Sequence, residues 1–221
     1  MTLRFLSHLL KNPLPIYGNR QGRLEIRPIK QKKNGDSCNT YRVGFENHWG
    51  THVDCPAHFF DKGRSVAAYP AESWLFVSPQ VIRVCIEDGE LLTLAHLNQG
   101  IGKETDIILF CSGWSKKRST KRYSTHNPGV DASFGRHLRA HFPKVRAVGF
   151  DWISLSANQR RQEGRQAHRA FLNPRGKGKP IFIVEDMDLS GPLHGLSEIW
   201  VAPLRVGGID SAPCTVMGIF Q

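Results

Sequence analysis

Three histidines and one aspartate fall within eleven residues in the N-terminal third of the chain. His52 and Asp54 are two residues apart, so on an extended chain their side chains lie on the same face. Gly50 allows the backbone to bend and bring His48 toward them, and a proline imposes a second bend before His58. This spacing predicts that imidazole and carboxylate groups converge.

Such a convergence would suit Zn²⁺, Mn²⁺ or Fe²⁺, which accept nitrogen and oxygen ligands. No cysteines occur at matching spacing, which argues against a closed structural zinc site, and Cys55 should point away from Asp54 and pack. The alternative is a set of strand-end histidines satisfied by hydrogen bonds. We favour the metal, because burying several titratable groups together without a counter-ion is costly.

The elements that must position these groups are predicted to be mostly strands, because helical periodicity is scarce and short apolar or alternating runs are frequent. The expected strands are 23–27 and 41–45, each with one buried face, and then 75–77, 80–86, 106–111, 146–150, 180–185, 198–204 and 214–220. The expected helices are 93–99 and 132–142, and the polar stretches 115–128 and 158–179 are expected to be loops. We therefore predict a single α/β domain over 1–221, with a mixed sheet flanked by few helices.

The composition, 40% apolar and 22% charged over 221 residues, excludes a disordered or fibrous chain. No apolar run reaches the roughly 18–20 residues that a membrane span needs, and the N-terminus is too polar for a secretory signal, so we expect a cytoplasmic protein. Five scattered cysteines without a C-x-x-C pair indicate reduced thiols.

The net charge of +11 could attract nucleic acid, an anionic membrane or small acidic metabolites. The basic residues occur in groups, at 30–33, 116–122 and 160–179, among Gly, Ser, Asn and Gln. No nucleic-acid-binding motif accompanies them, so solvated loops are favoured over a nucleic-acid surface.

The motif His-x-Gly-Thr-His-x-Asp-x-Pro-x-His, complete over 48–58, resembles that of the cyclase-like metal-dependent hydrolases, which include bacterial kynurenine formamidases and isatin hydrolases. The resemblance continues in family order through 148–155, 167–168, 184–191 and 202–213. It implies a swivelling β/β/α-like fold and a homodimer or homotetramer.

The resemblance also implies roles for individual residues. His48 and His52 would bind a first metal ion, His168 a second, and Asp54 and Glu185 would bridge the two, while His58 would move protons. Zn²⁺ is the expected ion and Mn²⁺ the alternative, with one or two ions bound. Independently of the family, Glu185 ends an apolar run, where an acid can emerge at a cleft or simply face water.

The expected substrate is a small molecule, held by residues near the metal. Segment 13–19 is similar to the family segment that reaches the pocket, although Tyr17 is followed directly by Gly18 where the kynurenine formamidases have Trp, then Pro, Gly and Asp. Tyr17, Phe59 and Trp114 are the predicted substrate contacts, although aromatic side chains are more often core. Arg205 is a candidate carboxylate clamp or a structural ion-pair partner.

Three functions fit these residues. The first is a metal-dependent hydrolase, arylformamidase-like, that cleaves an amide, formamide or lactam C–N bond of an aromatic substrate. The second is a cyclase or lyase that uses the same metal to stabilise an enolate. The third is a non-catalytic protein on the same fold that binds an anion. His58 favours an enzyme, because a binding protein has no need of a proton-transfer group.

Overall fold

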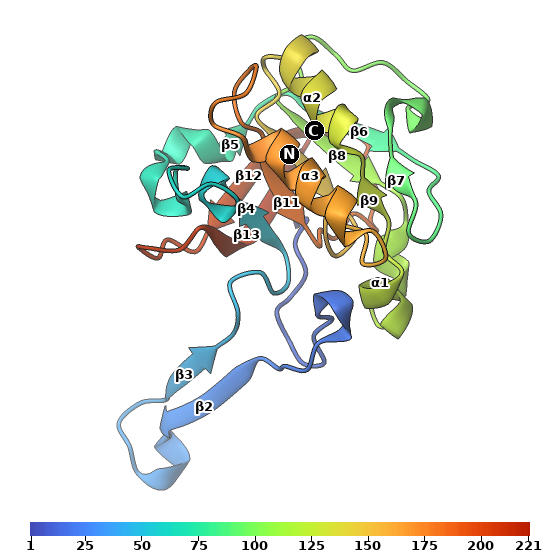
Figure 1. Cartoon of the computed structure of the whole chain (residues 1–221). Helices are drawn as coiled ribbons and strands as arrows, with labels where there is room; N and C mark the ends of the chain where they lie inside the picture. The colour runs from blue at the N-terminus through green and yellow to red at the C-terminus, as the bar shows by residue number, and fades with distance from the viewer.

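A nine-stranded mixed sheet forms the centre of the fold in a computed structural model that describes all 221 residues (Figure 1). In spatial order the strands are β5 (Leu75–Phe76), β12 (Leu196–Pro203), β13 (Ser211–Phe220), β4 (His52–Asp54), β11 (Phe182–Glu185), β10 (Ala147–Phe150), β8 (Ile107–Cys111) and β6 (Pro79–Arg83), with β1 (Thr2–Phe5) also paired to β13. The predicted α/β class with a mixed sheet is confirmed.

The sheet changes character at β11. The four strands β11, β10, β8 and β6 run parallel, whereas β4, β13, β12 and β5 pair in antiparallel fashion. The two edge strands, β5 and β6, are separated by only Val77 and Ser78 in the chain. Such a short link requires the edges to lie close together, so the sheet curls until it is nearly closed.

Alternation along the strands divides the buried residues into two cores. On β8, Ile107 and Leu109 belong to one core, while Ile108 and Phe110 belong to the other, which lies under the helices. The strands between them are apolar on both faces, as expected for a sheet covered on both sides.

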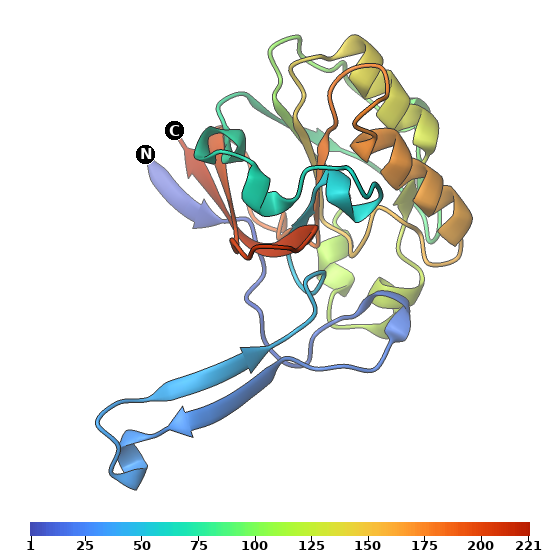
Figure 2. The same ribbon diagram turned by 60° about the vertical axis from the view of Figure 1, so that its left-hand side comes forward.

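Three α-helices accompany the sheet, α1 (Lys121–Thr125), α2 (Ala132–His141) and α3 (Arg161–Leu172), with α2 and α3 side by side on one face (Figures 1 and 2). The predicted helix at 132–142 is confirmed. The prediction of loops at 158–179 and 115–128 was wrong, since these stretches contain α3 and α1. The helix predicted at 93–99 is only a 3-10 turn, Leu94–His96, capped by Thr93.

A two-stranded hairpin, β2 (Glu25–Lys30) and β3 (Thr40–Gly44), projects from the body (Figures 1 and 2). Both strands were predicted, but the buried face expected for each was wrong, because every residue of β2 is exposed. Ile26 pairs with Val43, and Pro28 with Tyr41, so these side chains share one face of the hairpin. The alternation therefore marks an apolar face that this chain leaves in solvent.

The remaining elements are short. Strands β7 (Leu91–Leu92) and β9 (Gly129–Val130) form a separate parallel pair, and 3-10 turns occupy Tyr17–Asn19, Lys32–Asn34, Pro56–His58, Val66–Ala68, Ala71–Trp74 and Trp114–Lys117. All five cysteines are free, and Cys55 is buried in the core as predicted. No helix has the length and apolar character needed to cross a bilayer.

Candidate metal centre

The antiparallel seam between β4 and β11 brings the two distant halves of the candidate site together. Glu185, the last residue of β11, lies opposite His52 in the register. Val53 and Cys55 pack into the core on one side of β4, so the alternating His52 and Asp54 face the other side, beneath the helices. The bends expected around this strand are present, with Gly50 at φ +70° and a 3-10 turn from Pro56 to His58.

The carboxylates of Asp54 and Glu185 stand between imidazoles on both sides. Oδ1 of Asp54 lies 3.6 Å from Nε2 of His52, and its Oδ2 lies 3.6 Å from Nε2 of His168. Glu185 is arranged in the same way, with Oε2 3.3 Å from Nε2 of His52 and Oε1 3.5 Å from Nε2 of His168. Each carboxylate thus offers one oxygen to each imidazole. His48 joins the first side, its Nδ1 3.2 Å from Oδ1 of Asp54.

The two buried imidazoles are fixed by their other nitrogen. Nδ1 of His52 lies 2.9 Å from the carbonyl of Gly50, and Nδ1 of His168 lies 2.8 Å from the carbonyl of Gly164, one turn earlier in α3. Because a carbonyl only accepts, both Nδ1 atoms carry a proton, and Nε2 is in each ring the nitrogen that faces the carboxylates and could bind a metal ion. A hydrogen bond from the second ring nitrogen to a backbone carbonyl is a common way for proteins to orient a metal-binding histidine.

Helix α3 explains how His168 reaches the cluster. Gly164, Ala167, His168 and Phe171 are all buried, at the spacing of one helix face. Gly164 has no side chain because a Cβ there would lie 2.1 Å from Oγ of Ser156. The imidazole of His168 is therefore presented inward by a tightly packed helix.

Glu185 is held by the loop after β10. Its Oε1 accepts a hydrogen bond from the backbone N–H of Leu155 at 2.6 Å and lies 3.4 Å from Oγ of Ser154. The amide of Asn127 donates to the carbonyls of Ser154 and Ser156 and fixes this loop in turn. The carboxylate is consequently preorganised.

The residues present fit a divalent cation. Nε2 of His52 and both carboxylate oxygens of Asp54 are buried without a hydrogen-bond partner, an arrangement that is costly unless a cation shares them. Ligand atoms of His52, Asp54 and Glu185 all lie within 4.8 Å of one another, as do those of His48, Asp54 and His58. The donors, imidazole nitrogen and carboxylate oxygen, suit Zn²⁺ or Mn²⁺. The two-sided carboxylates could serve one ion or two.

These groups shift one another's pKa. Burial lowers the pKa of His168, but its contacts with Asp54 and Glu185 outweigh burial and raise that pKa to about 10. Burial likewise opposes protonation of His48, yet Asp210 and Asp54 raise its pKa to about 10. The neighbouring imidazoles overcome burial to lower the pKa of Glu185 to about 2. The imidazoles thus hold protons where a metal ion would bind.

His58 forms a separate pair with Asp210. Its Nδ1 lies 2.6 Å from Oδ2 of Asp210, which is also 3.4 Å from Nε2 of His48. Although burial opposes it, contact with these two imidazoles keeps the pKa of the Asp210 carboxyl below its usual range. The ionised carboxylate accepts a hydrogen bond from Nδ1–H of His58, which leaves the other ring nitrogen free to act as a base.

Asp210 was absent from the predicted site. Its segment belongs to the stretches that resemble the family, and it stands immediately before β13, which pairs with β4. An acid at the start of a strand adjoining the histidine motif is the sequence signal that could have identified it.

The three predicted substrate contacts lie in different surroundings. Phe59 stacks on the ring of His168 at 4.8 Å between centroids and meets His58 edge-on. The hydroxyl of Tyr17 is buried without a partner, and burial raises its pKa to about 12. Trp114 is packed in the core beneath the helices, with Nζ of Lys117 3.5 Å from its ring centre. Arg205 is exposed and forms no ion pair.

A buried ion pair supports the end of β11. Asp186 adopts a left-handed backbone conformation, with φ +51°, and receives two hydrogen bonds from Arg118, at 2.9 and 2.6 Å. The hydroxyl of Tyr123 donates to the same carboxylate, and Thr51 donates to the carbonyl of Asp186. Because Thr51 precedes His52 and Asp186 follows Glu185, this network ties together the two segments that carry the ligands.

Replacing Asp186 with alanine should destabilise the protein by about 3–5 kcal/mol, since it leaves the guanidinium of Arg118, whose side chain is only 15% exposed, without its carboxylate partner. Urea unfolding followed by tryptophan fluorescence measures this change. The matched control is Asp88→Ala, which removes the partner of Arg122 in an exposed pair and should have little effect. Equal effects of the two substitutions would contradict the structural role of the network.

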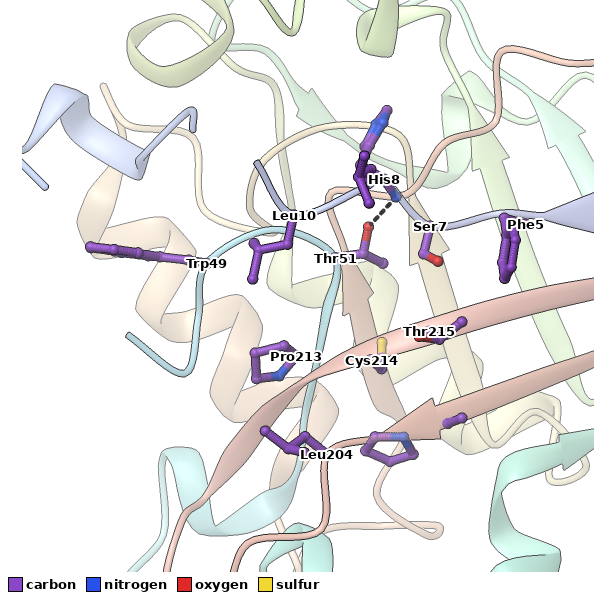
Figure 3. A pocket seen from close by; sticks show the side chains of 13 residues that line it. Phe5, Ser7, His8, Leu10, Trp49, Thr51, Leu204, Pro213, Cys214 and Thr215 are labelled. Carbon is purple, nitrogen blue, oxygen red and sulfur yellow. Dashed lines mark hydrogen bonds between the residues drawn. The ribbon is translucent and has the colours of Figure 1, made fainter. Parts of the chain in front are cut away.

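A hollow of about 680 Å³ lies on the other side of the histidine segment (Figure 3). Thr51 faces it and accepts a hydrogen bond from the backbone N–H of His8. The lining is mostly apolar and includes Phe5, Leu10, Trp49, Pro203, Leu204 and Pro213. None of the candidate metal ligands lines this hollow, so it is separate from the site.

Known proteins resemble this chain along most of its length. The model of the Cyclase family, described as "Putative cyclase", matches residues 5–157. Cyclase-like protein 1 of Arabidopsis thaliana is 25% identical in an alignment 219 residues long that covers 94% of this chain and 81% of that protein.

Solved structures share the fold. Isatin hydrolase A from Labrenzia aggregata, bound to benzyl benzoate, has a TM-score of 0.79 at 21% identity and covers all of this chain and 94% of its own. A structure described as a "predicted metal-dependent hydrolase" from Bacillus stearothermophilus has a TM-score of 0.72 at 22% identity, and the match covers 98% of this chain and 97% of that one.

The family match and the site geometry are complementary. The matched residues include the whole histidine motif but end before His168, Glu185 and Asp210, so the second half of the site depends on the geometry described above. The match nevertheless spans well over half of the chain and confirms the resemblance seen in the motif. The chain belongs to the Cyclase family.

Proposed function

We propose that this protein is a metal-dependent hydrolase that cleaves an amide, formamide or lactam C–N bond in a small aromatic substrate. One observation supports the proposal most strongly: buried imidazoles and carboxylates from β4, α3 and β11 meet, and Nε2 of His52 and both carboxylate oxygens of Asp54 have no hydrogen-bond partner in the protein. Solved structures with this fold include isatin hydrolases, whose name describes the same class of reaction.

The metal ligands would be His48, His52, Asp54, His168 and Glu185. A divalent cation of the zinc type supplies, when bound, a water of pKa about 7 and a Lewis acid for a carbonyl oxygen. Zn²⁺ is the ion that we expect, and Mn²⁺ is the alternative.

His58 would be the general base and acid. The Asp210 carboxylate accepts a hydrogen bond from Nδ1–H of His58 and so orients the ring. The second ring nitrogen can then take a proton from the attacking water and deliver it to the leaving nitrogen. The side chain is 25% exposed, so it can exchange that proton with solvent between turnovers. The Asp210 carboxylate would stabilise the imidazolium formed in the first step.

Aromatic side chains beside the cluster support an aromatic substrate. Phe59 presents a ring next to both His58 and His168, and Tyr17 has a buried hydroxyl with no partner in the protein. Such a hydroxyl could donate to a substrate oxygen. We propose that these two residues contact the substrate, together with Trp114, which belongs to the core cluster against which both of them pack.

The proposal is tested by purifying the protein without chelator, measuring its metal content by mass spectrometry, and assaying the same sample against N-formylkynurenine, isatin and a panel of aryl amides. We expect at least one Zn²⁺ or Mn²⁺ per chain and hydrolysis of one substrate class, lost with EDTA and restored by the metal. Metal-loaded protein without hydrolysis of any of these compounds would contradict the hydrolase assignment.

Metal binding should release protons and strengthen as pH rises. His48 and His168 have pKa values raised to about 10, so each holds a proton at pH 7 that the ion must displace. Calorimetry of Zn²⁺ binding in two buffers of different ionisation heat measures the release, which we expect to be at least one proton per ion. An affinity independent of pH between 6 and 9 would contradict this linkage.

The metal-free protein should show the opposite trend in stability. A histidine whose pKa is raised from 6.5 to about 10 contributes stability that is complete below pH 6.5 and lost as pH rises toward 10. The depressed pKa of Glu185, about 2, contributes stability that is complete above pH 4.5 and lost as pH falls toward 2. The melting temperature of EDTA-treated protein should therefore be highest between pH 4.5 and pH 6.5, where both contributions are complete.

We also propose a homodimer or homotetramer that covers the apolar face of the hairpin. Ile26, Val43 and Tyr41 lie on that face and are 58%, 54% and 49% exposed, and an isolated two-stranded hairpin is marginally stable in water. The double substitution Ile26→Ser, Val43→Ser should shift the mass measured by light scattering toward the monomer. Arg27→Ser, Arg42→Ser on the opposite face is the control and should leave the mass unchanged.

A further inference from the structure

A hollow of about 550 Å³ lies on the outer surface where α2, α3 and the segment after α3 meet, away from the metal ligands. Helices α2 and α3 lie side by side in both views of the fold (Figures 1 and 2). Four cationic side chains line the hollow, Arg136 and Arg139 from α2, Arg169 from α3 and Lys177 beyond it. No acidic residue lines it.

The surrounding chain is strongly basic. Residues 132–180 contain eleven of the thirty lysines and arginines but only two of the nineteen acids, Asp151 and Glu163. Asp151 is fully buried and accepts hydrogen bonds from Ser112 and Gly113. Lys144 and Arg146 pair with Glu104 and Asp106 outside this stretch, but no acid pairs with any of the four cations that line the hollow, so the hollow has a local excess of positive charge.

Arg139 is the most constrained of the four cations. Its residue is only 6% exposed, and its guanidinium donates to the carbonyls of Ala170 at 2.7 Å, Asn173 at 2.7 Å and Gly178 at 2.9 Å. Its Nε is buried without a partner, and no carboxylate pairs with the charge. The carbonyls at the end of α3 offset part of the burial cost, but the net positive charge remains uncompensated.

The other three cations are exposed and not engaged by acids. Arg136, Arg169 and Lys177 form no ion pair, unlike Arg118, which is paired with Asp186. The guanidinium carbon of Arg169 lies 5.9 Å from the ring centre of Phe60, at the outer limit of a cation–π contact. Their N–H groups thus remain available at the rim of the hollow.

We propose that this hollow binds a small phosphate-bearing anion at a site distinct from the metal centre. The forked donors of arginine match the oxygens of a phosphoryl group, and several convergent cations favour a multiply charged ligand. The volume falls within the roughly 300–1,000 Å³ typical of small-molecule sites. Convergence on a hollow favours such a ligand over a nucleic acid, whose phosphates would contact a broad surface.

The test is calorimetric titration of the metal-loaded protein with inorganic pyrophosphate at fixed ionic strength. We expect saturable binding, weakened about tenfold by Arg136→Ala or Arg169→Ala, since each removes a hydrogen bond to a charged group. Lys103→Ala changes the net charge equally at an exposed position outside the hollow and should bind like the unchanged protein. Metal content should be the same in all variants.

Three results would overturn the proposal. The first is no saturable binding of pyrophosphate, and the second is equal weakening by Lys103→Ala, which would indicate general attraction by net charge. The third is tighter binding of a 20-base-pair DNA duplex than of pyrophosphate, with a steeper salt dependence, which would identify the basic face as a polyanion surface. Because Arg136 and Arg169 are exposed, neither substitution should prevent folding.

Discussion

Replacing Asp54 with alanine should remove the bound metal and abolish hydrolysis. Asp54 faces His48 and His52 through one oxygen and His168 through the other, so its loss opens both sides of the cluster. Since loss of even an outer hydrogen-bond partner of a metal ligand lowers affinity by about 10–100-fold, loss of this carboxylate should lower metal affinity more than 100-fold. Competition with a fluorescent chelator measures the affinity.

Glu185→Gln should behave in the same way, because Glu185 also faces both His52 and His168. Asp188→Ala is the matched control, since this acid lies three residues beyond Glu185 with a half-exposed side chain and is outside the ligand set. Stoichiometric metal in Asp54→Ala, or equal loss in Asp188→Ala, would contradict the assignment of Asp54 and Glu185 as ligands.

Replacing His58 with alanine should separate metal binding from turnover. His58 is paired with Asp210 rather than enclosed between Asp54 and Glu185, so its loss should leave the metal content unchanged. Loss of a general acid–base group should lower kcat by about 10²–10⁴. Metal analysis and steady-state kinetics on the same preparation measure both quantities.

Asp210→Asn provides a graded comparison with His58→Ala. The amide keeps the size of the side chain but removes the charge that stabilises the imidazolium, so a smaller loss of kcat is expected. Full activity in His58→Ala would exclude a proton-transfer role for this residue. Loss of metal in that variant would instead assign His58 to the ligand set.

Local chemistry made much of the site predictable from sequence. The motif over 48–58 fixes an alternating strand between two bends, and the structure has these features at Gly50 and Pro56. The runs that became β8, β10 and β11 are buried at every position and apolar at every position except the terminal Glu185, as is typical of parallel strands covered on both faces. What the motif alone does not contain is the pairing of β4 with β11, which is a long-range contact.

Helix α3 escaped prediction because its buried face is built from weakly apolar residues. Gly164, Ala167 and His168 occupy that face over most of the helix, and the strongly apolar Phe171 and Leu172 occur only at its C-terminal end, so the apolar period is barely visible. Gly164 stands on this face because α3 packs closely over Ser156 and leaves no room for a side chain. His168 stands on it because its imidazole points inward toward the carboxylates of Asp54 and Glu185. A candidate metal ligand, His168, thus occupies a buried helix position where an apolar residue would usually stand.

For the hairpin, the apolar signal was clear, but the burial that it predicted was wrong. Its strands alternate as half-buried strands should, and the apolar face is present, but no part of this chain covers it. A single sequence specifies which side chains share a face, yet it cannot specify whether the covering surface belongs to the same chain. The alternation of Ile26 and Pro28 is therefore consistent with an interface as well as with a core.

The most direct test of the account is a crystal structure of protein loaded with Zn²⁺, with anomalous data collected on both sides of the zinc absorption edge. We predict an anomalous peak about 2.0–2.2 Å from Nε2 of His52 and from carboxylate oxygens of Asp54 and Glu185. A fully loaded crystal with its peak elsewhere, or with none at these three residues, would contradict the claim that the two halves of the chain bind a metal together.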